Sequence, residues 1–124
     1  MNRIVLGLHF LGWIAVLALV ILSLVPGDLR PHTGYPNLGE HFIAYFGAAF
    51  LLTIGVITPR RSIGIVLLLT ICAVAMEIIQ NFVPGRNPAV TDALSGTFGA
   101  IAGALLAVGV TRIWKQSWPP RTSK

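Results

Sequence analysis

The chain has 124 residues, of which 55% are hydrophobic and only 10% are charged, and its formal net charge is +5. A water-soluble domain has about 25% charged residues, so this chain has too few to cover a water-facing surface. The composition therefore indicates a single compact membrane domain. The positive charge does not indicate nucleic-acid binding, because the basic residues lie between apolar runs and form no stripe among aromatic residues.

Four apolar runs follow one another along the chain, and each has the length of a membrane-spanning helix, which needs about 20 residues. Proline and glycine lie between the runs, where they end helices. Lipid offers no hydrogen-bond partners to the backbone, so such segments are expected to be helical. We therefore predict an all-α fold, an integral membrane bundle of four transmembrane helices, with spans at residues 4–25, 38–58, 63–83 and 88–110.

Lysine and arginine are distributed unequally between the two sides of these spans. With four spans, both termini lie on one side, and seven of the nine basic residues lie there too. The other side has only Arg30 and Arg86. The positive-inside rule therefore predicts cytoplasmic termini, with a basic cytoplasmic tail at residues 111–124.

The acidic and amide side chains of the spans are expected to gather at one depth. At helical rise, Glu77 lies about 9 Å below the outer end of the third span, and Asp92 lies about 6 Å into the fourth. Tyr45 shares a helix face with His41 near the outer end of the second span. We predict one polar layer just inside the outer leaflet, built from three spans and a loop: Glu40, His41, Glu77, Gln80, Arg86 and Asp92.

Helix capping is an alternative role for some of these polar residues. Asn37 and Glu40 fit a capping box, with Asn37 as the N-cap and Glu40 at the third helical position. Asn87 fits the N-cap of the fourth span, with Pro88 at the first helical position.

Pairing is the alternative role for the ionisable residues. A carboxylate as deep as Glu77 costs about 2.5 kcal/mol or more in lipid, so it is expected to be functional or to pair with His41 or Arg86 inside the bundle. Asp92 could pair with Arg86 to close the turn. His41 and Tyr45 could instead be interfacial residues.

Small residues recur at helical spacing in the fourth span, at Gly96, Gly99 and Gly103. Small residues let helices approach closely in lipid, and we expect them to serve packing within the bundle rather than a dimer face. Such packing would draw the polar groups of the third and fourth spans together.

No metal site or cofactor is predicted. The sequence has no metal-ligand spacing, no phosphate-binding glycine loop and no nucleophile motif, and its histidines are far apart. Cys72 is the single cysteine, so no disulfide can form within the chain.

Three stretches together resemble the VanZ-like family of small polytopic bacterial membrane proteins. They are "HFIAYF" from His41, "EIIQNFVPGR" from Glu77 and "DALSGTFGAIAG" from Asp92, and the similarity extends over roughly residues 20–105. The chain has Asn37-Leu38 where many members have Asp-Lys, and Gly96 where many have asparagine. The resemblance implies a bacterial inner-membrane protein. The namesake of the family is linked to lowered susceptibility to the glycopeptide teicoplanin, and most members have no assigned biochemical activity.

Two function classes follow. The first is a binding module whose outer polar pocket holds a membrane lipid or a lipid-linked cell-wall precursor. Arg86 would pair with its phosphate or carboxylate, and His41, Tyr45 and Gln80 would supply hydrogen bonds. The second is a membrane-embedded enzyme acting on a lipid.

In the enzyme, Glu77 or Asp92 would be the general base and His41 its partner. Arg86 would then stabilise developing negative charge. The oligomeric state is not predicted.

Overall fold

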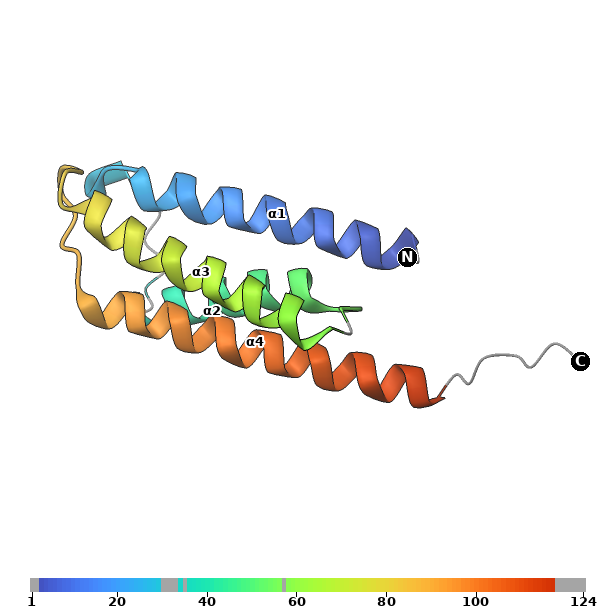
Figure 1. The fold of residues 1–124 in the computed structure, drawn as a ribbon. Helices are drawn as coiled ribbons and strands as arrows, with labels where there is room; N and C mark the ends of the chain where they lie inside the picture. Colours follow the sequence, from blue (N-terminus) through green and yellow to red (C-terminus); the bar gives the residue numbers. More distant parts are fainter. Residues whose placement is uncertain (1–2, 30–33, 35, 57, 118–124) are drawn as a thin grey trace, which may run out of the picture.

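The computed structural model describes residues 3–29, 34, 36–56 and 58–117. This part of the chain is entirely helical apart from its turns and connections, and it contains no strand (Figure 1). The helices are α1 (Arg3–Leu24), the short 3₁₀ helix η1 (Gly27–Leu29), α2 (Asn37–Thr53), α3 (Pro59–Gln80) and α4 (Val90–Ser117). The predicted all-α bundle of four helices is confirmed.

Three of the helices, α1, α3 and α4, are long and apolar enough to cross a membrane. α2 has only 17 residues, which cover about 25 Å, against a hydrocarbon core of about 30 Å. Large apolar side chains such as Phe10, Ile71 and Leu105 are exposed on the outside of the bundle. Helices that are apolar on the outside as well as the inside are typical of membrane spans, so the chain is a membrane protein.

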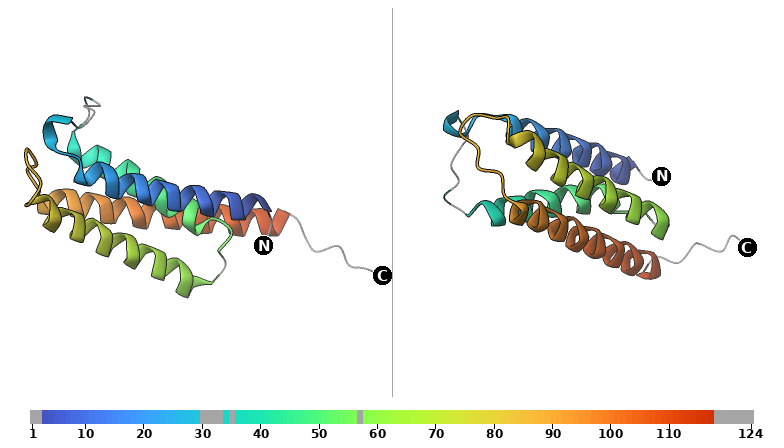
Figure 2. Two further views of the ribbon diagram at one scale, coloured as in Figure 1. Left: turned by 90° about the horizontal axis from the view of Figure 1, so that it is seen from above. Right: turned by 60° about the vertical axis from the view of Figure 1, so that its left-hand side comes forward.

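α2 and α3 lie between α1 and α4, and each of them contacts all the other helices (Figures 1 and 2). α1 begins and α4 ends at the same end of the bundle (Figure 1). We call this the terminal end. The opposite end carries the connection between α3 and α4, residues 81–89, and we call it the polar end.

The boundaries of three helices differ from the predicted spans. α1 matches its span to within one residue, but α3 begins earlier, at Pro59, because proline suits the first helical position. α3 also ends earlier, at Gln80 rather than at residue 83. α4 begins at Val90 and continues to Ser117, so residues 111–117 of the expected tail are helical and the rest of the tail lies outside the described residues.

α2 ends at Thr53 rather than at residue 58, because the chain turns at Gly55, where φ is +77°. The backbone around this turn is bonded to side chains of two other helices. His9 Nε2 donates to the carbonyl of Ile54 at 2.8 Å, and Thr111 Oγ1 accepts from the Gly55 N–H at 2.9 Å. Since α1 and α4 supply these partners, the short helix can end inside the bundle.

The start of α2 also differs from the prediction. Pro36 is the N-cap, and its carbonyl accepts the N–H groups of Gly39 and Glu40 at 2.9 and 3.3 Å. Asn37 is therefore already helical, and the predicted capping box with Asn37 as N-cap is wrong. The cause is the extended backbone of Pro36, with φ at −59° and ψ at 141°, which takes the cap position itself.

The glycines of α4 pack against α2. A Cβ atom at Gly99 would lie 2.3 Å from the carbonyl oxygen of Phe42, and one at Gly103 would lie 2.2 Å from that of Phe46. The prediction that small residues serve packing within the bundle is confirmed. The partner of these glycines is α2, not α3.

Candidate functional site

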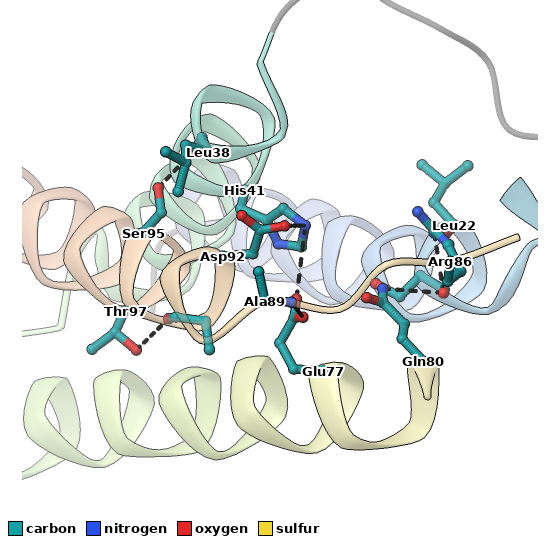
Figure 3. A network of polar contacts seen from close by, with 12 residues as sticks. Leu22, Leu38, His41, Glu77, Gln80, Arg86, Ala89, Asp92, Ser95 and Thr97 are labelled. Atoms are coloured by element: carbon teal, nitrogen blue, oxygen red, sulfur yellow. Dashed lines mark hydrogen bonds and ion pairs between the residues drawn. The ribbon is translucent and has the colours of Figure 1, made fainter. Parts of the chain in front are cut away.

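Three of the predicted polar residues meet at the polar end of the bundle, each from a different helix (Figure 3). His41 Nε2 lies 4.0 Å from Glu77 Oε1 and 3.9 Å from Asp92 Oδ2. Their side chains are only 10–13% exposed. The prediction that Glu77 faces His41 or Arg86 inside the bundle, and not lipid, is confirmed, and the residue that it faces is His41. We call His41, Glu77 and Asp92 the carboxylate–histidine centre.

Helix boundaries explain why the three residues lie at the same depth. His41 is four residues after the first residue of α2, Glu77 is three residues before the last residue of α3, and Asp92 is two residues after the first of α4. α2 and α4 begin at the polar end and α3 ends there. At a rise of about 1.5 Å per residue, all three lie within roughly one helical turn of that end.

Glu77 caps α4 from the neighbouring helix. Its Oε2 accepts the N–H of Ala89 at 2.9 Å, and Ala89 directly precedes the first residue of α4. The first N–H groups of a helix have no partner within the helix, so this bond satisfies one of them. The predicted start of this helix at Pro88, with Asn87 as N-cap, is wrong because helical structure begins only at Val90.

The second oxygen of the Glu77 carboxylate, Oε1, differs from Oε2 in its hydrogen bonding. Glu77 Oε1 is buried and has no hydrogen-bond partner, and it is the oxygen that faces the His41 ring. Buried polar atoms are nearly always bonded, so an orphan at this position needs an explanation.

Tyr45 lies in the core directly below the centre. It is 1% exposed, and its ring stacks on that of His41, with the centroids 6.5 Å apart and an interplanar angle of 11°. A Cβ atom at Gly96 would lie 2.8 Å from the Tyr45 ring. Tyr45 is therefore placed to support the His41 ring, and the missing side chain at position 96 makes room for it.

Arg86 and Gln80 lie apart from the centre and hold the end of α1 (Figure 3). Arg86 Nε donates to the carbonyl of Val25 at 3.1 Å, and Nη2 donates to those of Ser23, at 3.0 Å, and Leu22. Gln80 Nε2 also donates to Ser23, at 3.2 Å. The last carbonyls of a helix lack partners within it, and a positive charge there is favourable. We call Arg86 and Gln80 the α1 anchor.

The α1 anchor was not foreseen from the sequence. Its acceptors are backbone carbonyls, 57–64 residues away along the chain. Backbone carbonyls carry no residue-specific signal, so only the three-dimensional arrangement shows this role. The sequence did mark both residues as polar groups at this end.

The family model of VanZ/LLP1 matches residues 8–114. The chain belongs to the VanZ/LLP1 family. The matched range includes the carboxylate–histidine centre and the α1 anchor, so both are parts of the VanZ domain. No curated protein and no solved structure matches the chain significantly.

A groove of about 360 Å³ lies elsewhere in this VanZ domain, between the first half of α1 and the first half of α3. His9, Trp13 and Arg61 are among the residues that line it. These residues belong to the half of the bundle nearer the terminal end, so the groove is separate from the carboxylate–histidine centre.

Proposed function

We propose that this VanZ-family protein lies in the bacterial inner membrane and binds a lipid-linked or anionic ligand of the cell envelope at the polar end of its bundle. The observation that carries the proposal is the convergence of His41, Glu77 and Asp92 from three helices. Ionisable side chains are costly among membrane helices and typically mark paths for substrates, ions or protons.

Helix capping alone does not account for the centre. The bond from Ala89 explains one oxygen of Glu77, and Asp92 gains from the positive end of its own helix. Neither of these effects needs a histidine between the two carboxylates, and neither satisfies Glu77 Oε1. Binding of a ligand would account for the histidine between the two carboxylates and for the unbonded oxygen of Glu77, which capping does not.

The position of the centre suits a lipid ligand. The centre lies about one helical turn from the polar end, while apolar side chains cover the outside of the bundle. A head group could therefore reach the polar end while its acyl chains stay beside the helices. Arg86 adds a positively charged side chain at this end.

The orientation of the bundle is part of the proposal. The distribution of lysine and arginine favours cytoplasmic termini, and the polar end then faces the cell envelope. The VanZ resemblance makes glycopeptide susceptibility the phenotype to examine, and it makes lipid-linked cell-wall precursors the ligand class to examine first.

Retained lipids test the proposal. Protein extracted in mild detergent is examined by native mass spectrometry as wild type, Asp92→Asn and His41→Gln, with Arg61→Gln at the terminal end as the matched control. We expect the wild type and the control to retain one defined anionic lipid or precursor. The two centre variants should lose at least about tenfold in affinity, equivalent to roughly 1.4 kcal/mol. Equal retention in all four proteins would remove the centre from ligand binding.

A membrane-embedded enzyme is the second candidate, and the position of His41 favours it. An imidazole about 4 Å from each of two carboxylates resembles a general acid–base arrangement that could act on a bound lipid. In that case, Glu77→Gln should abolish turnover of the retained lipid while leaving its retention intact. A lipid that is retained unchanged by the wild type would favour the binding module.

A further inference from the structure

We propose that His41, Glu77 and Asp92 form a site for a divalent transition-metal ion, with Zn²⁺ as the best match. Each residue offers one ligand atom, and these atoms all lie within 4.8 Å of one another. Histidine nitrogen and carboxylate oxygen are the common ligands of catalytic zinc, which has three protein ligands and an open position.

The spacing of the three atoms fits an ion between them. His41 Nε2 approaches the two carboxylates to 4.0 and 3.9 Å, and one ligand atom from each residue lies within 4.8 Å of the other two. A point equally distant from three such atoms lies at most about 2.8 Å from each, against bond lengths of ~2.0–2.2 Å for Zn²⁺. Small side-chain movements would therefore complete the coordination.

Glu77 Oε1 supplies independent support. The side chain is nine-tenths buried, and this oxygen has no hydrogen-bond partner although it faces the middle of the cluster. A bound ion is one of the recognised explanations of such an orphan. Oε2 is meanwhile held by the Ala89 N–H, which leaves Oε1 as the oxygen available for a metal.

The charges of the cluster balance with a divalent cation. Two carboxylates and a neutral imidazole neutralise a charge of +2, whereas two carboxylates alone leave a net negative charge away from water. Imidazole suits zinc and similar metals, while Mg²⁺ and Ca²⁺ prefer oxygen ligands only. The mixed nitrogen and oxygen set therefore favours a transition metal.

Neighbouring groups orient the ligands, as outer-shell partners do in metal sites. The Ala89 N–H fixes the Glu77 carboxylate, and the Tyr45 ring stacks on His41. This proposal departs from the sequence-based expectation of no metal. The ligands lie on three helices, so their spacing along the chain matches no local metal motif.

A metal ion would also explain how the centre receives an anionic head group. Two carboxylates repel an anion, but a metal ion with an open position attracts a phosphate oxygen. This step rests on the proposed function, whereas metal binding itself can be measured without any lipid ligand.

The test is equilibrium dialysis of the full chain against ZnCl₂. The protein carries no polyhistidine tag, is treated with a chelator, and is reconstituted in nanodiscs of a zwitterionic lipid. We expect one Zn²⁺ per chain in the wild type. Glu77→Gln should weaken binding by more than the 10–100-fold that loss of an outer-shell partner typically costs. Glu40→Gln removes a carboxylate next to His41 but outside the cluster, so it should bind like the wild type.

Folding is controlled in two ways. Glutamine at position 77 can still accept the Ala89 N–H, and Asp92→Asn is a second variant that removes a ligand from another helix. Equal zinc content in the wild type and both variants would refute the proposed metal site. Binding of Mg²⁺ or Ca²⁺ as tightly as Zn²⁺ would refute its assignment to a transition metal. A wild type that binds no zinc but retains its lipid would refute the metal and leave the proposed function standing. A wild type that binds zinc but retains no lipid would support the metal site and refute the proposed function.

Discussion

Gly103→Ala is expected to destabilise the bundle by about 1–3 kcal/mol, as overpacking of a close interface does. The new methyl group would lie 2.2 Å from the carbonyl oxygen of Phe46, and a backbone atom can move away only if α2 moves with it. Alanine is intrinsically better than glycine in a helix by about 1 kcal/mol, so a measured loss must come from the contact. Gly99→Ala should behave alike, with a contact of 2.3 Å to Phe42.

Gly109→Ala is the matched control on the same helix. A Cβ atom at Gly109 meets nothing within 4 Å, so this variant should be neutral or slightly more stable. Unfolding by denaturing detergent, followed by far-UV circular dichroism, gives the three free energies of unfolding. If Gly103→Ala were as stable as Gly109→Ala, the close α2–α4 approach would not exist in the membrane.

Arg86→Ala is expected to lower the free energy of unfolding by about 3 kcal/mol. The change removes the side-chain donor of two carbonyls at the end of α1, those of Leu22 and Val25. It also removes one of two donors to the carbonyl of Ser23, which keeps its bond from Gln80. An unsatisfied buried polar group costs about 1–3 kcal/mol, and partial exposure of this end reduces the sum. The free energy of unfolding of Arg86→Lys should lie between those of the wild type and Arg86→Ala, because an ammonium keeps the charge but lacks the planar fork of the guanidinium.

Arg60→Ala is the control for this comparison, because Arg60 is exposed at the start of α3. This variant should change the free energy of unfolding by less than about 0.5 kcal/mol. Detergent unfolding again measures stability, and proteolysis in the connection after α1 reports whether the helix has detached. A stable Arg86→Ala protein that has lost its lipid would show that Arg86 binds the ligand directly, as the sequence suggested, and does not anchor α1.

The depth of the polar residues could be predicted from the sequence, since a helix has a fixed rise and the apolar runs fix the ends of the spans. Glu77 and Asp92 are near the ends of such runs, so their common depth with His41 could be predicted. Depth alone did not identify the partners, because Gln80 and Arg86 share this depth and bond to the end of α1 instead. The packing role of Gly99 and Gly103 could also be predicted, because helical spacing of small residues has few other causes in lipid.

Contacts between helices could not be predicted in the same way. Hydropathy continues past Thr53, but Gly55 turns the chain and the side chains of His9 and Thr111 complete the turn. Local capping patterns at residues 37 and 87 failed because Pro36 caps α2, while Glu77 caps α4 from another helix. A pattern within one segment carries no information on partners supplied by a different one.

The orientation of the polar end decides whether an envelope ligand can reach the centre, and cysteine labelling measures it directly. Cys72→Ala removes the single native thiol. Asn87→Cys then places one at an exposed position beside Arg86, leaving the α1 anchor intact, and Arg61→Cys places one at an exposed position of the terminal end. Each protein is treated with a membrane-impermeant thiol reagent in intact cells, with any outer membrane permeabilised. We expect position 87 to be labelled without lysis and position 61 only after it; the reverse pattern would place the carboxylate–histidine centre on the cytoplasmic side and contradict the proposed function.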